Sequence, residues 1–292
     1  MLTKEKFHSL LQSGPLFLDG ATGSNLQKAG MPRGCCTEKW ILENPKALTD
    51  LQLQYVQAGS HIIYAPTFQA QPIALEKVGL EDQTESINEQ LVKLSRSVSD
   101  SVLGAGNLTT LATFTDSFDE GFFDLLVENY RRQIKGLLNG GADLLAAETL
   151  MYPTEAEAIL TAAELEGAET VLYTFTMQSD GSLFSGRDAA PILQELEQAG
   201  AAAVGFNCVA ADAMTPGLVS RLKRYVKGPL VCKPNAGNPV IGADGIPCYP
   251  MSPEEFAEIQ TDCYRMGASI LGGCCGTSPD FIKSTKDKIL CL

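Results

Sequence analysis

The feature that most constrains the fold is an alternation of short apolar runs with longer amphipathic segments. The runs have the length and the flanking Gly, Pro and polar residues of strands, and the segments between them carry apolar residues at helical spacing. Strands that alternate with helices favour a parallel sheet built from β/α units. The eight runs cover residues 16–19, 61–67, 101–107, 142–148, 170–177, 202–208, 229–235 and 268–274.

Eight alternations within 292 residues favour a closed barrel over an open, doubly wound sheet. We therefore predict an α/β fold of a single (β/α)8 TIM-type barrel that occupies residues 1–292 as one domain. In such barrels the chemistry takes place at the C-terminal ends of the strands. The polar residues at the ends of the runs are therefore the candidates for a functional site.

The ends of the amphipathic segments carry residues that cap helices. Ser252 and Ser278 each offer an N-cap hydroxyl and are each followed by a proline and an acid, which suit the first helical turn. Glycines that would end a helix in a left-handed conformation stand before five of the runs. These glycines are Gly59, Gly140, Gly167, Gly200 and Gly267.

Charge and composition exclude several kinds of partner. A formal net charge of −13 opposes binding to phosphates, so we expect no nucleic acid and no anionic membrane as a partner. No apolar run is long enough to span a bilayer, and the first residues lack the features of a signal peptide, which predicts a cytoplasmic protein. Nine cysteines in that compartment favour metal binding or core packing over disulfides. Because the chain has two histidines, a metal site would depend on sulfur.

Three cysteines stand at the ends of two predicted strands. Cys208 ends the run 202–208, and Cys274 and Cys275 end the run 268–274. Adjacent residues of a strand point to opposite faces, so Cys274 and Cys275 can bind one ion only if the backbone leaves strand geometry, which the flanking glycines permit. Three cysteine ligands with an open fourth position are typical of a catalytic zinc site. Packing as small buried residues, or a redox pair, is the alternative.

Four ordered motifs at the predicted strand ends resemble the homocysteine S-methyltransferase family. They are Asp19-Gly20-Ala21-Thr22-Gly23-Ser24, Gly205-Phe206-Asn207-Cys208, Pro234-Asn235-Ala236-Gly237 and Gly272-Gly273-Cys274-Cys275-Gly276-Thr277. The resemblance covers essentially the whole chain and looks closest to the homocysteine-binding module of cobalamin-dependent methionine synthase. It implies a zinc ion bound by Cys208, Cys274 and Cys275, with Asn235 as a labile fourth ligand that the substrate displaces.

The resemblance also implies how the substrate is bound. It assigns Asp19 and Glu148 to the amino group of homocysteine, although Asp19 could instead cap the Gly-rich turn that follows it. A charge that ends an apolar run, as Glu148 does, is costly to bury without a partner. Asn107 and Asn207 are candidates for orienting the substrate or the groups around it; the alternative is that either one simply hydrogen-bonds loop backbone. The substrate carboxylate is assigned to backbone amides of the first loop, at Ala21, Thr22, Gly23 and Ser24.

The implied reaction transfers a methyl group to the thiol of homocysteine and gives methionine, a step of methionine biosynthesis. A free thiol has a pKa of about 8.5 and is mostly protonated at neutral pH, whereas a thiol bound to zinc is deprotonated. The eight runs are all used by one barrel, so we expect the donor to be methylcobalamin carried by a separate corrinoid protein. The alternatives are S-methylmethionine, betaine or S-adenosylmethionine as donor, another thiol or a selenol as acceptor, or a zinc-binding barrel without activity.

Three further positions are noted. Cys35 and Cys36 form a second doubled pair, in the long first loop, for which we predict packing while a minor metal or redox role stays open. Lys233 precedes Pro234, at a position where the resemblance implies an aromatic or acidic residue.

Overall fold

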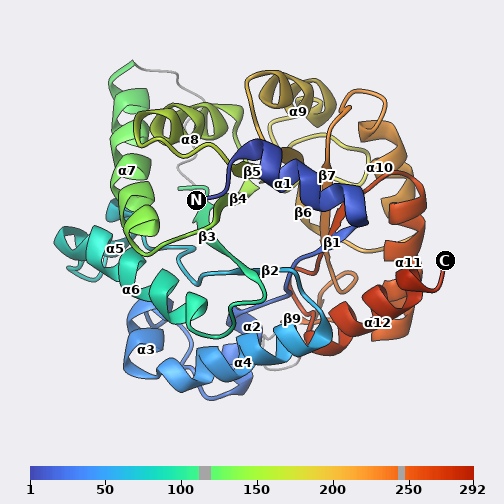
Figure 1. Cartoon of the computed structure of the whole chain (residues 1–292), viewed down its shortest axis with the longest axis horizontal. Helices are drawn as coiled ribbons and strands as arrows, with labels where there is room; N and C mark the ends of the chain where they lie inside the picture. The colour runs from blue at the N-terminus through green and yellow to red at the C-terminus, as the bar shows by residue number, and fades with distance from the viewer. Residues whose placement is uncertain (112–119, 243–246) are drawn as a thin grey trace.

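The computed structural model describes residues 1–111, 120–242 and 247–292. Eight parallel strands form a barrel with helices around it (Figure 1), in the order β1-β10-β7-β6-β5-β4-β3-β2. The ring closes where Leu18 bridges Ile62 and the His61 N–H donates to the Phe17 carbonyl at 2.7 Å. The predicted TIM-type barrel is therefore confirmed. Its strands are β1 (Leu16–Phe17), β2 (Ile62–Tyr64), β3 (Leu103–Thr109), β4 (Leu144–Leu150), β5 (Val171–Phe175), β6 (Ala203–Ala210), β7 (Leu230–Asn235) and β10 (Ile270–Leu271).

Each predicted run overlaps one barrel strand, but β3, β4 and β6 each extend two residues beyond the predicted end. A short antiparallel hairpin of β8 (Val240–Ile241) and β9 (Pro247–Cys248) follows β7 and was not predicted. Its two-residue strands are too short to show a period in the sequence.

The helices lie outside the strands, and among the described residues none is long and apolar enough to cross a membrane. They are α1 (Lys4–Leu10), α2 (Gly23–Lys28), α3 (Thr37–Glu43), α4 (Pro45–Ala58), α5 (Pro72–Glu76), α6 (Thr84–Arg96), α7 (Glu120–Asn139), α8 (Pro153–Leu165), α9 (Ala189–Gln198), α10 (Thr215–Leu222), α11 (Pro253–Arg265) and α12 (Pro279–Leu290), with 3-10 turns at Leu11–Ser13 and Glu81–Gln83.

The helix ends follow the predicted capping residues in most places. Ser252 forms a full capping box with Glu255 at the start of α11, whereas Ser278 precedes α12 without a side-chain cap bond. Four of the five predicted glycines have a positive φ, but after α7 it is Gly141 rather than Gly140 that does. A Cβ at Gly140 would lie 2.6 Å from the Cβ of Val92 on α6, so this glycine lets two helices approach.

The barrel is closed at its N-terminal end, which leaves the other end for a site. Helix α1 lies there: the His8 Nε2 atom is 2.7 Å from the carbonyl of Ala202, just before β6. Phe7 is fully buried and belongs to the cluster of interior barrel residues that includes Leu18 and Ile270.

A side chain on Gly205 would collide with the β7 backbone, so glycine permits the β6–β7 pairing there.

Candidate functional site

A cavity of about 400 Å³ lies among the C-terminal ends of the strands. It is lined by residues from β2, β3, β4, β6 and β7 and from the segments that follow β1 and β10. Most of the predicted site residues line it together: Asp19, Ala21, Thr22, Gly23, Ser24, Asn107, Glu148, Cys208, Cys274 and Cys275. The other two do not line the cavity but hydrogen-bond to residues that do: Asn207 bonds to Cys274 and Asn235 bonds to Cys275.

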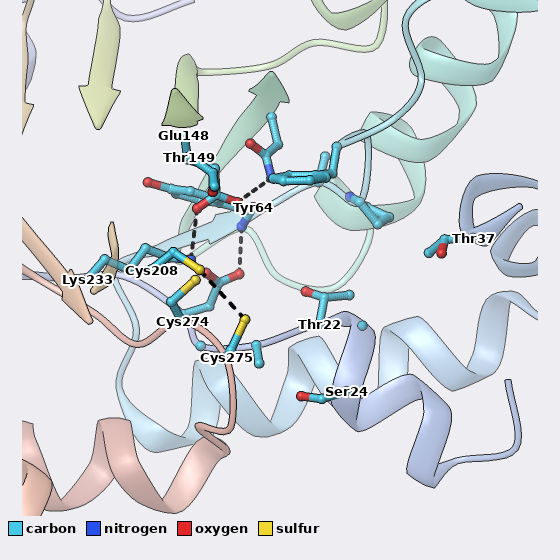
Figure 2. A pocket seen from close by; sticks show the side chains of 18 of the residues that line it. Thr22, Ser24, Thr37, Tyr64, Glu148, Thr149, Cys208, Lys233, Cys274 and Cys275 are labelled. Atoms are coloured by element: carbon cyan, nitrogen blue, oxygen red, sulfur yellow. Dashed lines mark hydrogen bonds and ion pairs between the residues drawn. The ribbon is translucent and has the colours of Figure 1, made fainter. Parts of the chain in front are cut away.

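The three predicted thiols converge at one end of the cavity (Figure 2). The Sγ atoms of Cys208, Cys274 and Cys275 lie within 4.8 Å of one another, and those of Cys208 and Cys275 are 3.9 Å apart. Sulfurs bound tetrahedrally to one zinc ion at about 2.3 Å would be about 3.8 Å apart. Hydrogen bonds from the Cys208 and Cys274 thiols lower the pKa of Cys275 below its ordinary value of 9.0. The donor set and its spacing therefore fit a zinc ion.

The backbone leaves regular geometry at all three thiols. Strand β10 ends at Leu271, so Cys274 and Cys275 lie in an irregular turn, which confirms the predicted departure from strand geometry. Cys208 lies inside β6 but has a φ of 58°, and the pairing of β6 with β7 shifts register between Asn207 and Ala210.

Two buried carboxylates, Asp19 and Glu148, line the same cavity. The Tyr64 N–H donates to Asp19 Oδ2 at 2.7 Å, so Asp19 bonds to the end of β2 rather than capping its own turn. Asn107 Nδ2 donates to Glu148 Oε1 at 2.8 Å. Among the described residues, no group donates to Asp19 Oδ1 or Asn107 Oδ1, although both atoms are buried. Burial raises the pKa of Asp19 from its ordinary value of 3.8 to about 7.

Lys233 is a site residue that the sequence did not predict. Its Nζ atom donates to Glu148 Oε2 at 3.1 Å and lies 5.0 Å from the centroid of the Tyr64 ring (Figure 2). The Lys233 and Glu148 side chains are 5% and 8% exposed, so this is a buried ion pair. The signal was present: a lysine inside a buried run needs a carboxylate partner, and Glu148 was a carboxylate without one.

The first loop has backbone N–H groups at the cavity wall. The Ala21 N–H already donates to Thr277 Oγ1 at 3.1 Å. Within the described part of the chain, the N–H groups of Thr22, Gly23 and Ser24 at the start of α2 donate to no acceptor, so they are free to bind an anion.

The remaining candidates lie around the thiols or away from them. Asn235 Oδ1 accepts the Cys275 N–H at 3.0 Å, and its role as a metal ligand stays a prediction. Cys35 and Cys36 pack against the core formed around α4 and do not join the three-thiol group. Tyr249, which follows β9, also hydrogen-bonds Cys275 and was missed in the sequence because it lies in no motif.

Comparisons with known proteins agree with this geometry. The model of the homocysteine S-methyltransferase family matches residues 16–289. The methionine synthase of Mycobacterium leprae is 28% identical over 91% of the chain, which spans 23% of that protein's length, and the homocysteine S-methyltransferase of Escherichia coli is 27% identical over 93% of the chain and 94% of its own length. The metallated crystal form of the Escherichia coli homocysteine methyltransferase MmuM superposes with a TM-score of 0.82 at 25% identity, covering 97% of this chain and 99% of that one. The chain therefore belongs to the homocysteine S-methyltransferase family.

Proposed function

We propose that this chain methylates the thiol of homocysteine, with a zinc ion held by Cys208, Cys274 and Cys275. The observation that carries the proposal is the composition of the cavity. It holds three clustered thiols together with two buried oxygens, Asp19 Oδ1 and Asn107 Oδ1, that lack donors among the described residues. Buried acceptors are normally paired, so these two favour a ligand that brings N–H donors.

The cavity matches the groups of an amino-acid thiol. When Asp19 and Glu148 are both ionised, these two carboxylates and Lys233 have a net charge of −2 + 1 = −1, which the ammonium of homocysteine would neutralise. The free N–H groups of Thr22, Gly23 and Ser24 suit the substrate carboxylate. The volume of about 400 Å³ lies in the range of small-molecule sites.

The thiol end would bind and activate the sulfur of the substrate. When bound, zinc supplies Lewis acidity that keeps the substrate thiol in its thiolate form at neutral pH. Cys208, Cys274 and Cys275 would leave a fourth position for that sulfur, which Asn235 would release. The contacts at both ends orient the sulfur for in-line attack on the methyl carbon.

For the donor, we infer a methyl-corrinoid carried by a separate protein. The support is an apolar rim: four large side chains in the loops after β5, β6 and β7 are each more than half exposed. They are Phe184, Met214, Val240 and Ile241. Exposed apolar groups on the loops that follow the barrel strands suit a protein partner, and similarity to a methionine synthase agrees with this choice.

A small cationic donor such as S-methylmethionine is the second candidate. Glu38 lines the same cavity and is 2% exposed, and its carboxylate accepts the Gln69 N–H at 2.9 Å. Within the described part of the chain it has no ion-pair partner, so it is suited to a cationic ligand.

Two measurements test the proposal. Calorimetry on the zinc-loaded protein should show homocysteine binding, and absence of binding would reject the acceptor. Methyl transfer to homocysteine is then measured from methylcobalamin and from S-methylmethionine under identical conditions. Turnover with S-methylmethionine and none with any methyl-corrinoid would reject the corrinoid donor and favour the second candidate.

A further inference from the structure

Two residues beside the cavity have a backbone conformation that is unusual for their type. Among the non-glycine residues of 1–111, 120–242 and 247–292, Thr149 and Cys208 alone have a positive φ, and in both it is 58°. Such a conformation costs about 1–3 kcal/mol and persists where the surroundings impose it. Thr149 directly follows Glu148, so its conformation helps to set the direction of the Glu148 carboxylate.

The sheet does not impose this conformation on either residue. The pairing of β4 with β5 shifts register between Ala147 and Leu150, and the pairing of β6 with β7 shifts between Asn207 and Ala210. Both residues with positive φ therefore lie where the regular ladder is interrupted.

The side chain of Asn207 takes the place of that ladder. It is fully buried; its Oδ1 accepts the Thr149 N–H at 2.7 Å, and its Nδ2 donates to Thr149 Oγ1 at 2.7 Å. Strand β5 lies between β4 and β6, so this contact reaches across a strand. Asn207 is also the residue directly before Cys208, so the side chain that bonds to Thr149 belongs to the backbone beside the second irregular position.

The same amide reaches the third strand end of the thiol cluster. Asn207 Nδ2 also donates to Cys274 Sγ at 3.8 Å. One side chain thus joins the backbone that carries Glu148 to two of the three thiols. An asparagine that only filled space would not need to make specific bonds to both Thr149 and Cys274.

We propose that Asn207 is a positioning residue that couples the Glu148 carboxylate to the thiol cluster. It holds Glu148 and the thiols at one fixed separation, so that the amino group and the sulfur of a single substrate are bound together. The inference rests on the proposed function. It predicts that Asn207 sets how strongly the protein prefers homocysteine over 4-mercaptobutyrate, the same thiol acid without the amino group.

The test is calorimetric binding of both thiols to zinc-loaded wild type and Asn207→Ala. We expect Asn207→Ala to weaken homocysteine binding by about ten- to thirtyfold, the equivalent of one to two hydrogen bonds. Binding of 4-mercaptobutyrate should change much less, so the preference falls. Adding Thr149→Gly should restore part of it, because glycine adopts a positive φ without strain.

Asn88→Ala is the matched control for a merely structural effect. Asn88 is also a fully buried asparagine, and its Nδ2 makes two hydrogen bonds, to the Ala70 and Thr84 carbonyls, away from the cavity. Its removal should lower the melting temperature and keep the preference. If Asn207→Ala does not fold, the neutral variant Asn207→Ser, whose shorter side chain cannot make the same bonds to Thr149 and Cys274, should show the same loss of preference.

The outcomes separate the two proposals. A variant of Asn207 that keeps the wild-type preference overturns the coupling and leaves the proposed function intact. Wild type that binds neither thiol overturns the proposed function, and the coupling falls with it.

Discussion

Replacing Glu148 by glutamine should affect both folding and substrate binding. In the wild type, Glu148 pairs with Lys233 at 3.1 Å, and both side chains are more than nine-tenths buried. Glu148→Gln leaves the lysine charge buried without this partner. Removing one member of a buried pair costs about 3–5 kcal/mol, a large fraction of the 5–15 kcal/mol that holds a typical domain folded.

The double variant Glu148→Gln/Lys233→Met separates the two effects. It removes both charges, and a neutral replacement of a buried pair is often close to neutral in stability, so most of the unfolding free energy should return. Homocysteine binding should not return, because the charge-assisted bond to the ammonium is lost. That bond is equivalent to about 1.5–3 kcal/mol, or about one to two decades in the dissociation constant.

Urea unfolding measures the first effect, and calorimetry on folded, zinc-loaded protein measures the second. Zinc content should stay that of the wild type in both variants, because Glu148 is not among the three thiols. The predicted destabilisation is refuted if Glu148→Gln has the same urea midpoint of unfolding as the wild type. The proposed bond to the ammonium is refuted if the double variant binds homocysteine as tightly as the wild type.

Three further predictions follow from the geometry. Single alanine variants of Cys208, Cys274 and Cys275 should lose stoichiometric zinc in metal analysis, and retention by all three would remove the proposed site. Homocysteine should bind more tightly as the pH rises through about 7, because Asp19 must ionise to pair with the ammonium. Asp19→Asn should flatten that dependence. The stability of the wild type should fall as the pH rises from about 4 to about 7, because the folded-state pKa of Asp19 is raised and its ionisation opposes folding. Asp19→Asn should remove this fall. Gly205→Ala should lower the urea midpoint strongly, since its methyl group would meet β7 backbone that cannot move aside; an unchanged midpoint would contradict this.

The sequence predicts the barrel because its signals are local. Each strand is a short apolar run, and each helix has its own period and capping residues, so all eight units could be located without knowledge of their contacts. The errors arise where the local signal is ambiguous or absent. Gly140 and Gly141 are adjacent, and only the packing of α7 against α6 determines which of them takes the positive φ. The β8–β9 hairpin pairs exposed two-residue strands that leave no period to detect.

The site was predicted less completely, because part of it depends on contacts between distant strands. The thiols and carboxylates were found because they end strands and because their motifs resemble a family. Lys233 was recognised as a departure from the aromatic or acidic residue that the resemblance implies. Its pairing with Glu148, 85 residues earlier, could not be predicted because it depends on the barrel bringing β4 and β7 within reach. The conformation of Thr149 left no signal, since threonine is a common strand residue and nothing local predicts its positive φ.

The groups proposed to bind homocysteine and those proposed to meet a donor lie on different parts of the barrel. The groups proposed to bind homocysteine come mainly from the barrel strands and the segments directly after them, which the closed sheet fixes in space. The groups proposed to meet a donor lie on longer connections: Glu38 on α3 between β1 and β2, and the exposed Phe184, Val240 and Ile241 after β5 and β7. Loops tolerate change better than strands do. One acceptor site can therefore serve relatives with different donors, and exchanging these loops should alter the use of the donor while the affinity for homocysteine is retained.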